Sequence, residues 1–171
     1  MNKLIKTSTF FILIVTLIAT SSCLNNKDDK HTAEVEKSEI TKFLLLLKED
    51  GNEIDTTASG MYYIIHKNGT GEFPQKGDIC SVEYVGYFIN GVIFDASKSL
   101  NEDGLWEYIY KYSSVIPGFE EAIGMMKTDE EATFIIPSDL AYGPAWYDII
   151  PPYTPLVFDI NLHDIRSKIA E

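Results

Sequence analysis

The chain has 171 residues, 45% of them hydrophobic, and its 14 basic against 26 acidic side chains give a formal charge of −12 at pH 7. This length allows one domain with appendages, and the 10 Tyr, 9 Phe and 2 Trp exclude a chain that is disordered throughout. The acidic balance, with no local cluster of basic residues, disfavours a nucleic-acid partner. Two cysteines, Cys23 and Cys80, are too few for a disulfide scaffold or a cysteine-built zinc site.

Residues 1–22 have the pattern of a secretory signal peptide: a basic start at Lys3 and Lys6, then an apolar run of about ten residues. A membrane-spanning helix needs ~20, so a retained span is disfavoured. The small residues before Cys23 resemble the lipobox of bacterial lipoproteins, although Thr20 stands where an aliphatic residue is usual. We therefore expect lipidation at Cys23 and a chain anchored to a membrane of the cell envelope, at the periplasmic side or surface of the outer membrane. Cleavage of a plain signal peptide is the alternative.

The next two segments are a tether and a helix. Residues 23–38 are polar and charged and are expected to form a flexible, lipid-anchored tether. Residues 39–59 are expected to hold an amphipathic helix and a linker, with Ser38 as N-cap and Gly51 as the stop. The apolar residues at helical spacing are Ile40, Phe43, Leu44 and Leu47. This stripe is too apolar to face water all round, so the helix is expected to pack on the main domain or on a second copy of the chain, as a homodimer.

Residues 60–166 are rich in β-forming residues and are expected to form one domain. Strands are expected at residues 61–66, 78–88, 92–95, 106–112, 132–136 and 156–162. A short helix opens at Pro117, with proline in the first turn and acidic residues near its positive end. The series predicts an α+β fold, in which a curved antiparallel sheet of about five strands wraps on one short helix behind the N-terminal amphipathic helix.

Two local features refine this expectation. Asn90 and Gly91 lie between apolar residues and predict a two-residue type I′ hairpin, because both central residues of that turn need positive φ. In the expected strand 78–88, Cys80, Val82 and Tyr84 share one face, while Ser81 and Glu83 point the other way. It is therefore expected to be a small buried hydrophobic residue rather than a reactive thiol.

Six short motifs then occur in an order and spacing typical of one enzyme family. They are residues 82–87 (VEYVGY), 94–97 (FDAS), 115–122 (VIPGFEEA), 140–143 (LAYG), 149–152 (IIPP) and 156–159 (LVFD). Together they resemble the FKBP family of peptidyl-prolyl cis-trans isomerases over about residues 60–165. The secretion signal and preceding helix are similar to the extracytoplasmic bacterial branch, and more narrowly to gliding-motility isomerase lipoproteins of Bacteroidota.

The resemblance implies which side chains form the site. It assigns three residues to catalysis: Phe94 in the wall, Tyr142, whose hydroxyl reaches a substrate carbonyl, and Asp95, beside the twisting amide. It assigns seven to substrate binding: Tyr84, Trp106, Val115, Ile116, Phe119, Ile150 and Phe158. For Asp95 two roles stay open, an electrostatic interaction with the carbonyl or a hydrogen bond that braces Tyr84.

The chain also departs from the family pattern. Trp106 stands where phenylalanine is usual, and Phe119 where tryptophan usually forms the floor, so the cavity should be deeper. The segment from Phe94 to Trp106 is about two residues longer than usual and offers only Lys98 as a partner for Asp95. The loop at residues 143–148 is about one residue shorter. We expect activity to be retained and specificity to shift.

The chemistry of the expected reaction suits such a site. An X-Pro bond isomerises slowly because amide resonance puts ~18–20 kcal/mol between its isomers. In the rotated state the carbonyl is less polar, so a water-poor aromatic cavity favours that state over the planar amide. We expect an isomerase that assists folding of exported proteins and binds their proline-containing segments. A catalytically weak proline-peptide binding module or chaperone in a motility or secretion complex is the alternative. No cofactor is expected, and the three histidines lie too far apart in sequence to suggest a metal site.

Overall fold

The computed structural model describes residues 31–101 and 103–167. The expected signal peptide and Cys23 lie outside the described residues. Among the described helices, none combines the length and apolar character required to cross a membrane.

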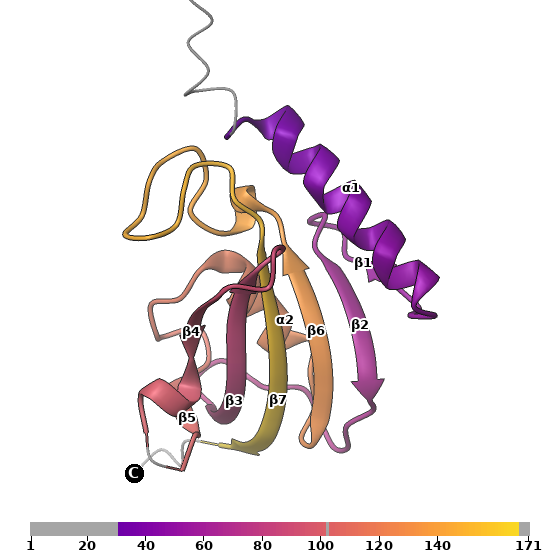
Figure 1. Cartoon of the computed structure of the whole chain (residues 1–171). Helices are drawn as coiled ribbons and strands as arrows, with labels where there is room; N and C mark the ends of the chain where they lie inside the picture. The colour runs from indigo at the N-terminus through magenta and orange to yellow at the C-terminus, as the bar shows by residue number, and fades with distance from the viewer. Residues whose placement is uncertain (1–30, 102, 168–171) are drawn as a thin grey trace, which may run out of the picture.

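An antiparallel sheet of seven strands forms the body of the domain (Figure 1). Its strands are β1 (Asp55–Thr56), β2 (Tyr62–Lys67), β3 (Ile79–Phe88), β4 (Ile93–Ala96), β5 (Trp106–Ile109), β6 (Glu130–Ile136) and β7 (Leu156–Arg166). The hydrogen-bonded order is β1-β2-β6-β7-β3-β4, and β5 also pairs with β3. The expected α+β class is confirmed, with seven strands in place of about five. Both residues of the short strand β1 are exposed, so it shows no alternation of apolar and polar side chains.

Strand β3 organises the part of the sheet that carries the site. One edge pairs with β7 along the whole strand, from Ile79 to Phe88. The other edge is shared, because the first half of β3 pairs with β5 and the second half with β4. The chain leaves β4 through the short 3₁₀ helix η1 (Ser97–Ser99) and returns to the same sheet edge as β5. Side chains of β3, β4 and β5 are thereby brought together.

Helix α2 (Pro117–Gly124) lies against one face of the sheet, as Figure 1 shows, and covers the core. Its proline occupies the first turn, as expected, and its buried residues are Gly118, Phe119, Ala122 and Ile123. The core beneath it includes Cys80, which is a free cysteine with no exposed surface, in line with the expected small hydrophobic residue. Burial raises the pKa of its thiol from 9.0 to about 12.

The hairpin between β3 and β4 differs from the expected type I′ turn. Only Gly91 of the pair has positive φ, at 83°. Its N–H donates to Phe88 O at 2.7 Å, and Phe88 N–H donates to Val92 O at 3.0 Å. The connection is therefore a three-residue loop, with a turn followed by a left-handed glycine. Asn90 instead accepts a hydrogen bond from Val92 N–H through its side chain at 3.0 Å, which satisfies the turn without positive φ at Asn90.

Helix α1 (Ala33–Glu49) begins five residues before the expected Ser38 N-cap. Thr32 caps it instead, because its hydroxyl accepts the Val35 N–H at 3.3 Å. Part of the expected tether, from Ala33 onward, is therefore helical. The helix ends as expected before Gly51, whose φ of 88° suits glycine.

Helix α1 crosses one end of the sheet (Figure 1). Glu36 and Ile40 are its buried residues. Of the expected apolar stripe, Phe43, Leu44 and Leu47 are half-buried, whereas Leu45 and Leu46, outside the stripe, are 55% and 58% exposed. The fully buried residues of the helix thus lie in its first half.

Gly118 supplies a stability test of the contact between α2 and the sheet. A Cβ at this position would overlap Ile136 Cγ2 and lie 3.2 Å from Leu140 O. Gly→Ala inside a helix normally stabilises by about 1 kcal/mol. We expect Gly118→Ala to lower the free energy of unfolding instead, by about 2 kcal/mol, measured by urea denaturation. In Ile136→Ala protein the same substitution should cost much less, and additive effects would contradict this account.

Candidate active site

A hollow of about 240 Å³ opens among β3, β4, β5, β7 and the start of α2. Its lining residues are Tyr84, Phe94, Asp95, Trp106, Ser114, Val115, Ile116, Phe119, Tyr142 and Phe158. Nine of the ten site residues expected from the sequence therefore surround one cavity. We call this hollow the aromatic cavity.

Tyr84 is the shared neighbour of the aromatic rings in this cavity. It projects from the middle of β3, where adjacent strands supply rings on both sides. Its ring centroid lies 5.8 Å from that of Trp106, 5.5 Å from Phe119 and 6.1 Å from Phe158. The first two contacts are edge-to-face, the arrangement that aromatic quadrupoles favour. These contacts hold the rings at fixed angles around an apolar space.

Asp95 lies at the polar margin of the cavity with both carboxylate oxygens occupied. Tyr84 donates its hydroxyl to Oδ2 at 2.9 Å, and Ala96 N–H donates to Oδ1 at 2.8 Å. Burial raises the pKa of Tyr84 well above its ordinary 10.0, and the hydrogen bond to Asp95 and the charge of that carboxylate raise it further. This geometry favours the bracing role for Asp95.

Lys98, which the sequence offered as a partner of Asp95, binds elsewhere. Its ammonium lies 3.0 Å from Glu83 Oε1. Glu83 directly precedes Tyr84 on β3, so its side chain lies on the opposite face of the sheet. Side chains alternate between the two faces of a strand, so a lysine that reaches Glu83 is directed away from the side of Tyr84. The partners of the Asp95 carboxylate are instead the Tyr84 hydroxyl and the Ala96 N–H.

Phe119 and Trp106 form the deeper part of the wall, with ring centroids 6.0 Å apart. Phe119 also packs on Phe158 at 5.4 Å. The helix that carries Phe119 is tied to β5 through Glu120, which accepts hydrogen bonds from Tyr108 Oη at 3.1 Å and from Lys111 N–H at 2.7 Å. These bonds fix Phe119 relative to the sheet.

Two contributors to the cavity were not expected from the sequence. Ser114 lines it beside Val115. Gly86 on β3 leaves room for two rings, because a Cβ there would lie 2.8 Å from Phe94 Cζ and 2.9 Å from Phe158 Cε1. Gly86 stands within a motif that was recognised, but a close approach of two side chains from other strands leaves no local sequence pattern.

The lip and the far side of the cavity come from two loops. Val115 and Ile116 precede α2, and the Ile116 carbonyl accepts the N–H groups of Phe119 and Glu120, both at 3.1 Å. On the opposite side Tyr142 stacks on Tyr147, with centroids 4.1 Å apart and planes 14° apart. Burial raises the pKa of Tyr142, and Tyr147 and Asp95 add to that shift. Its hydroxyl therefore remains a neutral donor at physiological pH.

Ile150 is the one expected site residue that does not line the aromatic cavity. It is 5% exposed and belongs to the core, and its backbone exchanges hydrogen bonds with Tyr147 at 2.8 and 3.0 Å. The bulky loop of residues 143–148 turns back on itself here. Tyr147 faces Tyr142 as a result, while Ile150 points inward.

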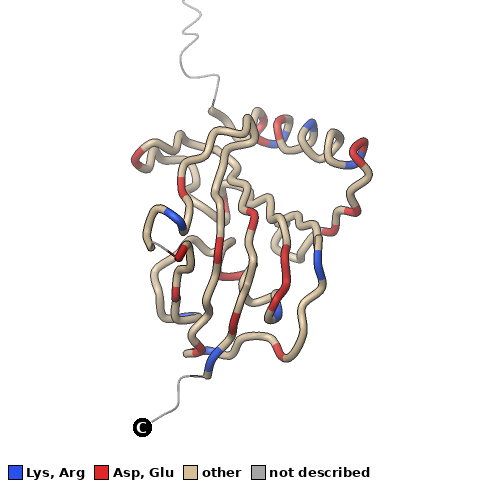
Figure 2. The backbone as a smooth tube through the Cα atoms, turned by 60° about the horizontal axis from the view of Figure 1, so that its bottom comes forward, with Lys and Arg blue, Asp and Glu red and all other residues tan. Residues whose placement is uncertain are grey.

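The remaining surface offers no comparable constellation in the part of the chain described. A larger groove of about 460 Å³ lies between α1 and residues 88–90 and 149–155; its lining is mainly apolar, but it lacks the packed cluster of rings found in the aromatic cavity. Within the described ranges, no group of three or more His, Cys, Asp or Glu side chains could hold a metal ion. Figure 2 shows acidic residues spread over strands, loops and α1, with basic residues interspersed.

Comparison with known proteins identifies the family. The model of the FKBP-type peptidyl-prolyl cis-trans isomerase family matches residues 70–163, which include every residue lining the aromatic cavity. The chain belongs to this family. Helix α1 lies outside the matched residues.

The relatives and structures agree with this placement. A probable FKBP-type isomerase FkpA from Neisseria meningitidis is 42% identical over 142 residues, which cover 81% of this chain and 50% of the relative. The crystal structure of FkpA from Escherichia coli superimposes with a TM-score of 0.67 at 32% identity, covering 79% of this chain and 61% of that one. A Pseudomonas syringae isomerase gives 0.65 at 33% identity, covering 80% and 97%. The chain spans about half the length of the curated relatives it matches.

The raised pKa of Tyr84 predicts a pH-dependent contribution to stability. The folded state holds the phenolic proton more tightly than the unfolded state, so the contribution is complete below the ordinary pKa of 10.0 and is lost as pH rises above it. Above this pH, the free energy of unfolding should fall less steeply with pH in Tyr84→Phe than in the wild type. The two slopes should differ by up to about 1.4 kcal/mol per pH unit. Urea denaturation at several pH values measures the slope. Tyr112→Phe, at a ring 69% exposed, serves as control, and equal slopes in wild type and Tyr84→Phe would contradict the assignment.

Proposed function

We propose that the chain catalyses cis-trans isomerisation of X-Pro peptide bonds in the aromatic cavity. The observation that carries this proposal is that the rings of Tyr84, Phe94, Trp106, Phe119 and Phe158 gather around one cavity. Membership of the isomerase family supports it. A proline ring inserted among these rings leaves its acyl carbonyl near the mouth, where Tyr142 and Asp95 lie.

Catalysis follows from differential stabilisation of the rotated amide. Rotation removes conjugation between nitrogen and carbonyl, so the rotated state is less polar and loses less hydration on entering an apolar space. Each 1.36 kcal/mol of preference for the rotated state gives about tenfold in rate. No covalent bond is made or broken, which fits a site built mainly of rings.

The polar groups at the mouth orient the peptide. The neutral Tyr142 hydroxyl donates to a substrate carbonyl, and the Ile116 N–H at the lip receives the chain beyond it. Asp95 holds the Tyr84 ring through the 2.9 Å hydrogen bond and presents a fixed negative charge beside the rotating amide. Ile150 acts indirectly, by holding the backbone of Tyr147 and so the ring on which Tyr142 stacks.

The place of action in this proposal is the cell envelope. The N-terminal pattern of residues 1–23 supports export and lipid attachment at Cys23. Relatives include an outer membrane protein MIP from Legionella longbeachae, 36% identical over 110 residues, which cover 64% of this chain and 46% of the relative. The clients would then be proline-containing segments of exported proteins. Self-association through the exposed leucines of α1 would let two cavities act on one client.

The proposed activity should be measurable as turnover of a small peptide. The full chain should accelerate cis-trans exchange of a proline tetrapeptide, measured by NMR exchange spectroscopy without a coupling protease. Tyr142→Phe removes only the hydroxyl and should lower kcat/KM about tenfold, the value of one hydrogen bond to the substrate. Tyr112→Phe is the matched control and should leave the rate unchanged.

A binding module without useful turnover is the competing function, and the Phe119 floor is the observation that favours it. Phenylalanine is smaller than tryptophan and has no ring N–H, so a proline ring would be held less tightly. In that case the peptide would titrate into the aromatic cavity while the exchange rate equals that of buffer. Such a result would reject catalysis and retain the site.

Lipid attachment is tested separately from catalysis. We expect the chain expressed in a bacterium with the lipoprotein pathway to incorporate labelled palmitate and to fractionate with membranes. Cys23→Ser should abolish both, while Cys80→Ala should retain both, because Cys80 is buried in the folded domain. Palmitate incorporation that persists in Cys23→Ser would overturn the assignment.

A further inference from the structure

Glu36 of α1 makes a buried polar contact with the domain. Its side chain is among the few charged ones in the interior, and the residue is 8% exposed. Oε1 accepts the backbone N–H of Ser138 at 2.5 Å, and Oε2 accepts the Ser138 hydroxyl at 2.7 Å. Both carboxylate oxygens are therefore used by one residue, 102 positions away in sequence.

Ser138 in turn holds the backbone on both sides of Tyr142. It opens the short 3₁₀ helix η2 (Ser138–Leu140) and is 1% exposed. Its carbonyl accepts the N–H of Ala141 at 2.8 Å and the N–H of Gly143 at 2.9 Å. The N–H and hydroxyl of Ser138 thus donate to Glu36, while the Ser138 carbonyl holds the two residues that flank Tyr142.

Loss of the Glu36 carboxylate should disturb the Ser138 turn, because the contact between them is polar and buried. A buried carboxylate must keep its hydrogen bonds, and in the described part of the chain no salt bridge is found at Glu36. Removing the carboxylate would leave the Ser138 N–H and hydroxyl buried without these acceptors. The turn would then move to reach other partners, and Tyr142 would move with it.

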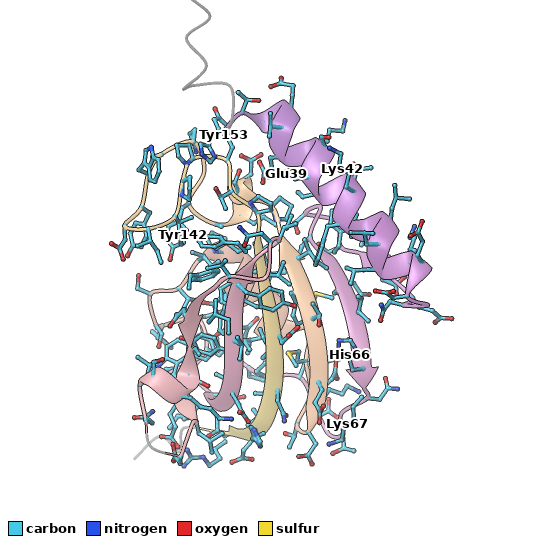
Figure 3. All side chains as sticks on the ribbon, viewed as in Figure 1. Glu39, Lys42, His66, Lys67, Tyr142 and Tyr153 are labelled. Carbon is cyan, nitrogen blue, oxygen red and sulfur yellow. The ribbon has the colours of Figure 1, made fainter. Side chains whose placement is uncertain are left out.

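A second contact joins the segment just before α1 to the loop of residues 143–148. The His31 ring lies 6.1 Å from the Trp146 ring in an edge-to-face arrangement. Tyr153, which follows this loop, donates its backbone N–H to Gly143 O at 2.9 Å. Figure 3 shows Tyr153 beside the first turns of α1, and Tyr142 below it, across the loop.

We propose that Glu36 is a positioning residue for the isomerase reaction, which sets the Tyr142 hydroxyl through Ser138. This inference rests on the proposed function. Helix α1, which lies outside the family match, would thereby affect turnover indirectly, through Ser138 and Tyr142.

The experiment compares four changes in the full chain: Glu36→Ala, Glu36→Gln, Ser138→Ala and the matched control Glu39→Ala, which removes an exposed carboxylate from the same helix. Glu36→Ala should lower kcat/KM for the proline tetrapeptide about fivefold. Glu36→Gln should restore most of it, because the amide oxygen still accepts the Ser138 N–H. Ser138→Ala keeps the backbone N–H and should give a smaller loss, and Glu39→Ala none.

Combination with Tyr142→Phe separates positioning from general destabilisation. If Glu36 acts through the Tyr142 hydroxyl, Glu36→Ala should cost little more once that hydroxyl is gone, within about twofold. Amide hydrogen exchange at Ala141 and Gly143 should also quicken in Glu36→Ala, as a readout independent of turnover.

The outcomes distinguish this inference from the proposed function. A wild-type chain without turnover rejects the function itself. If the wild type is active and Glu36→Ala leaves kcat/KM unchanged, the inference is overturned. It is also overturned if the fold-loss in the double variant equals the product of the fold-losses of Glu36→Ala and Tyr142→Phe. If Glu36→Ala fails to fold, Ser138→Ala gives the same test through the partner residue.

Discussion

The packing of rings around Tyr84 is the constraint on which the rest of the site depends. Its ring touches those of Trp106, Phe119 and Phe158, which come from three different elements. Its hydroxyl is bound to Asp95 on a fourth. The order of strands around β3 makes this possible, because β4, β5 and β7 all pair with it. The cavity therefore depends on the pairing of β4, β5 and β7 with β3.

The same packing explains why a carboxylate can lie beside an apolar space. Asp95 is held by the Tyr84 hydroxyl and by its neighbouring backbone amide, so its oxygens are satisfied before any substrate arrives. The rings then face the substrate beside the polar groups of Asp95, Ser114 and Tyr142, which also line the cavity. Selectivity for a rotated, less polar amide is a property of this arrangement as a whole.

Much of the site could be predicted from the sequence because its residues lie in short motifs that occur in a recognisable order. The resemblance of the ordered motifs to the FKBP family, rather than strand alternation, assigned Tyr84, Phe94, Asp95, Phe119 and Phe158 to one site, and they line one cavity. Features set by contacts between distant segments could not be predicted. Ile150 points into the core because the 143–148 loop folds back, and Asn90 avoids positive φ by a side-chain hydrogen bond. The Glu36–Ser138 contact joins residues 102 positions apart, so no local pattern marks it.

The measurement that tests the central claim most directly is the relative affinity of the cavity for rotated and planar prolyl groups. A prolyl peptide analogue with a fixed, unconjugated carbonyl can be compared by calorimetry with the matched planar amide. The structure predicts that the rotated analogue binds at least about tenfold more tightly, and that the difference shrinks when Phe94 is replaced by alanine. Equal affinity for the two compounds would contradict the account.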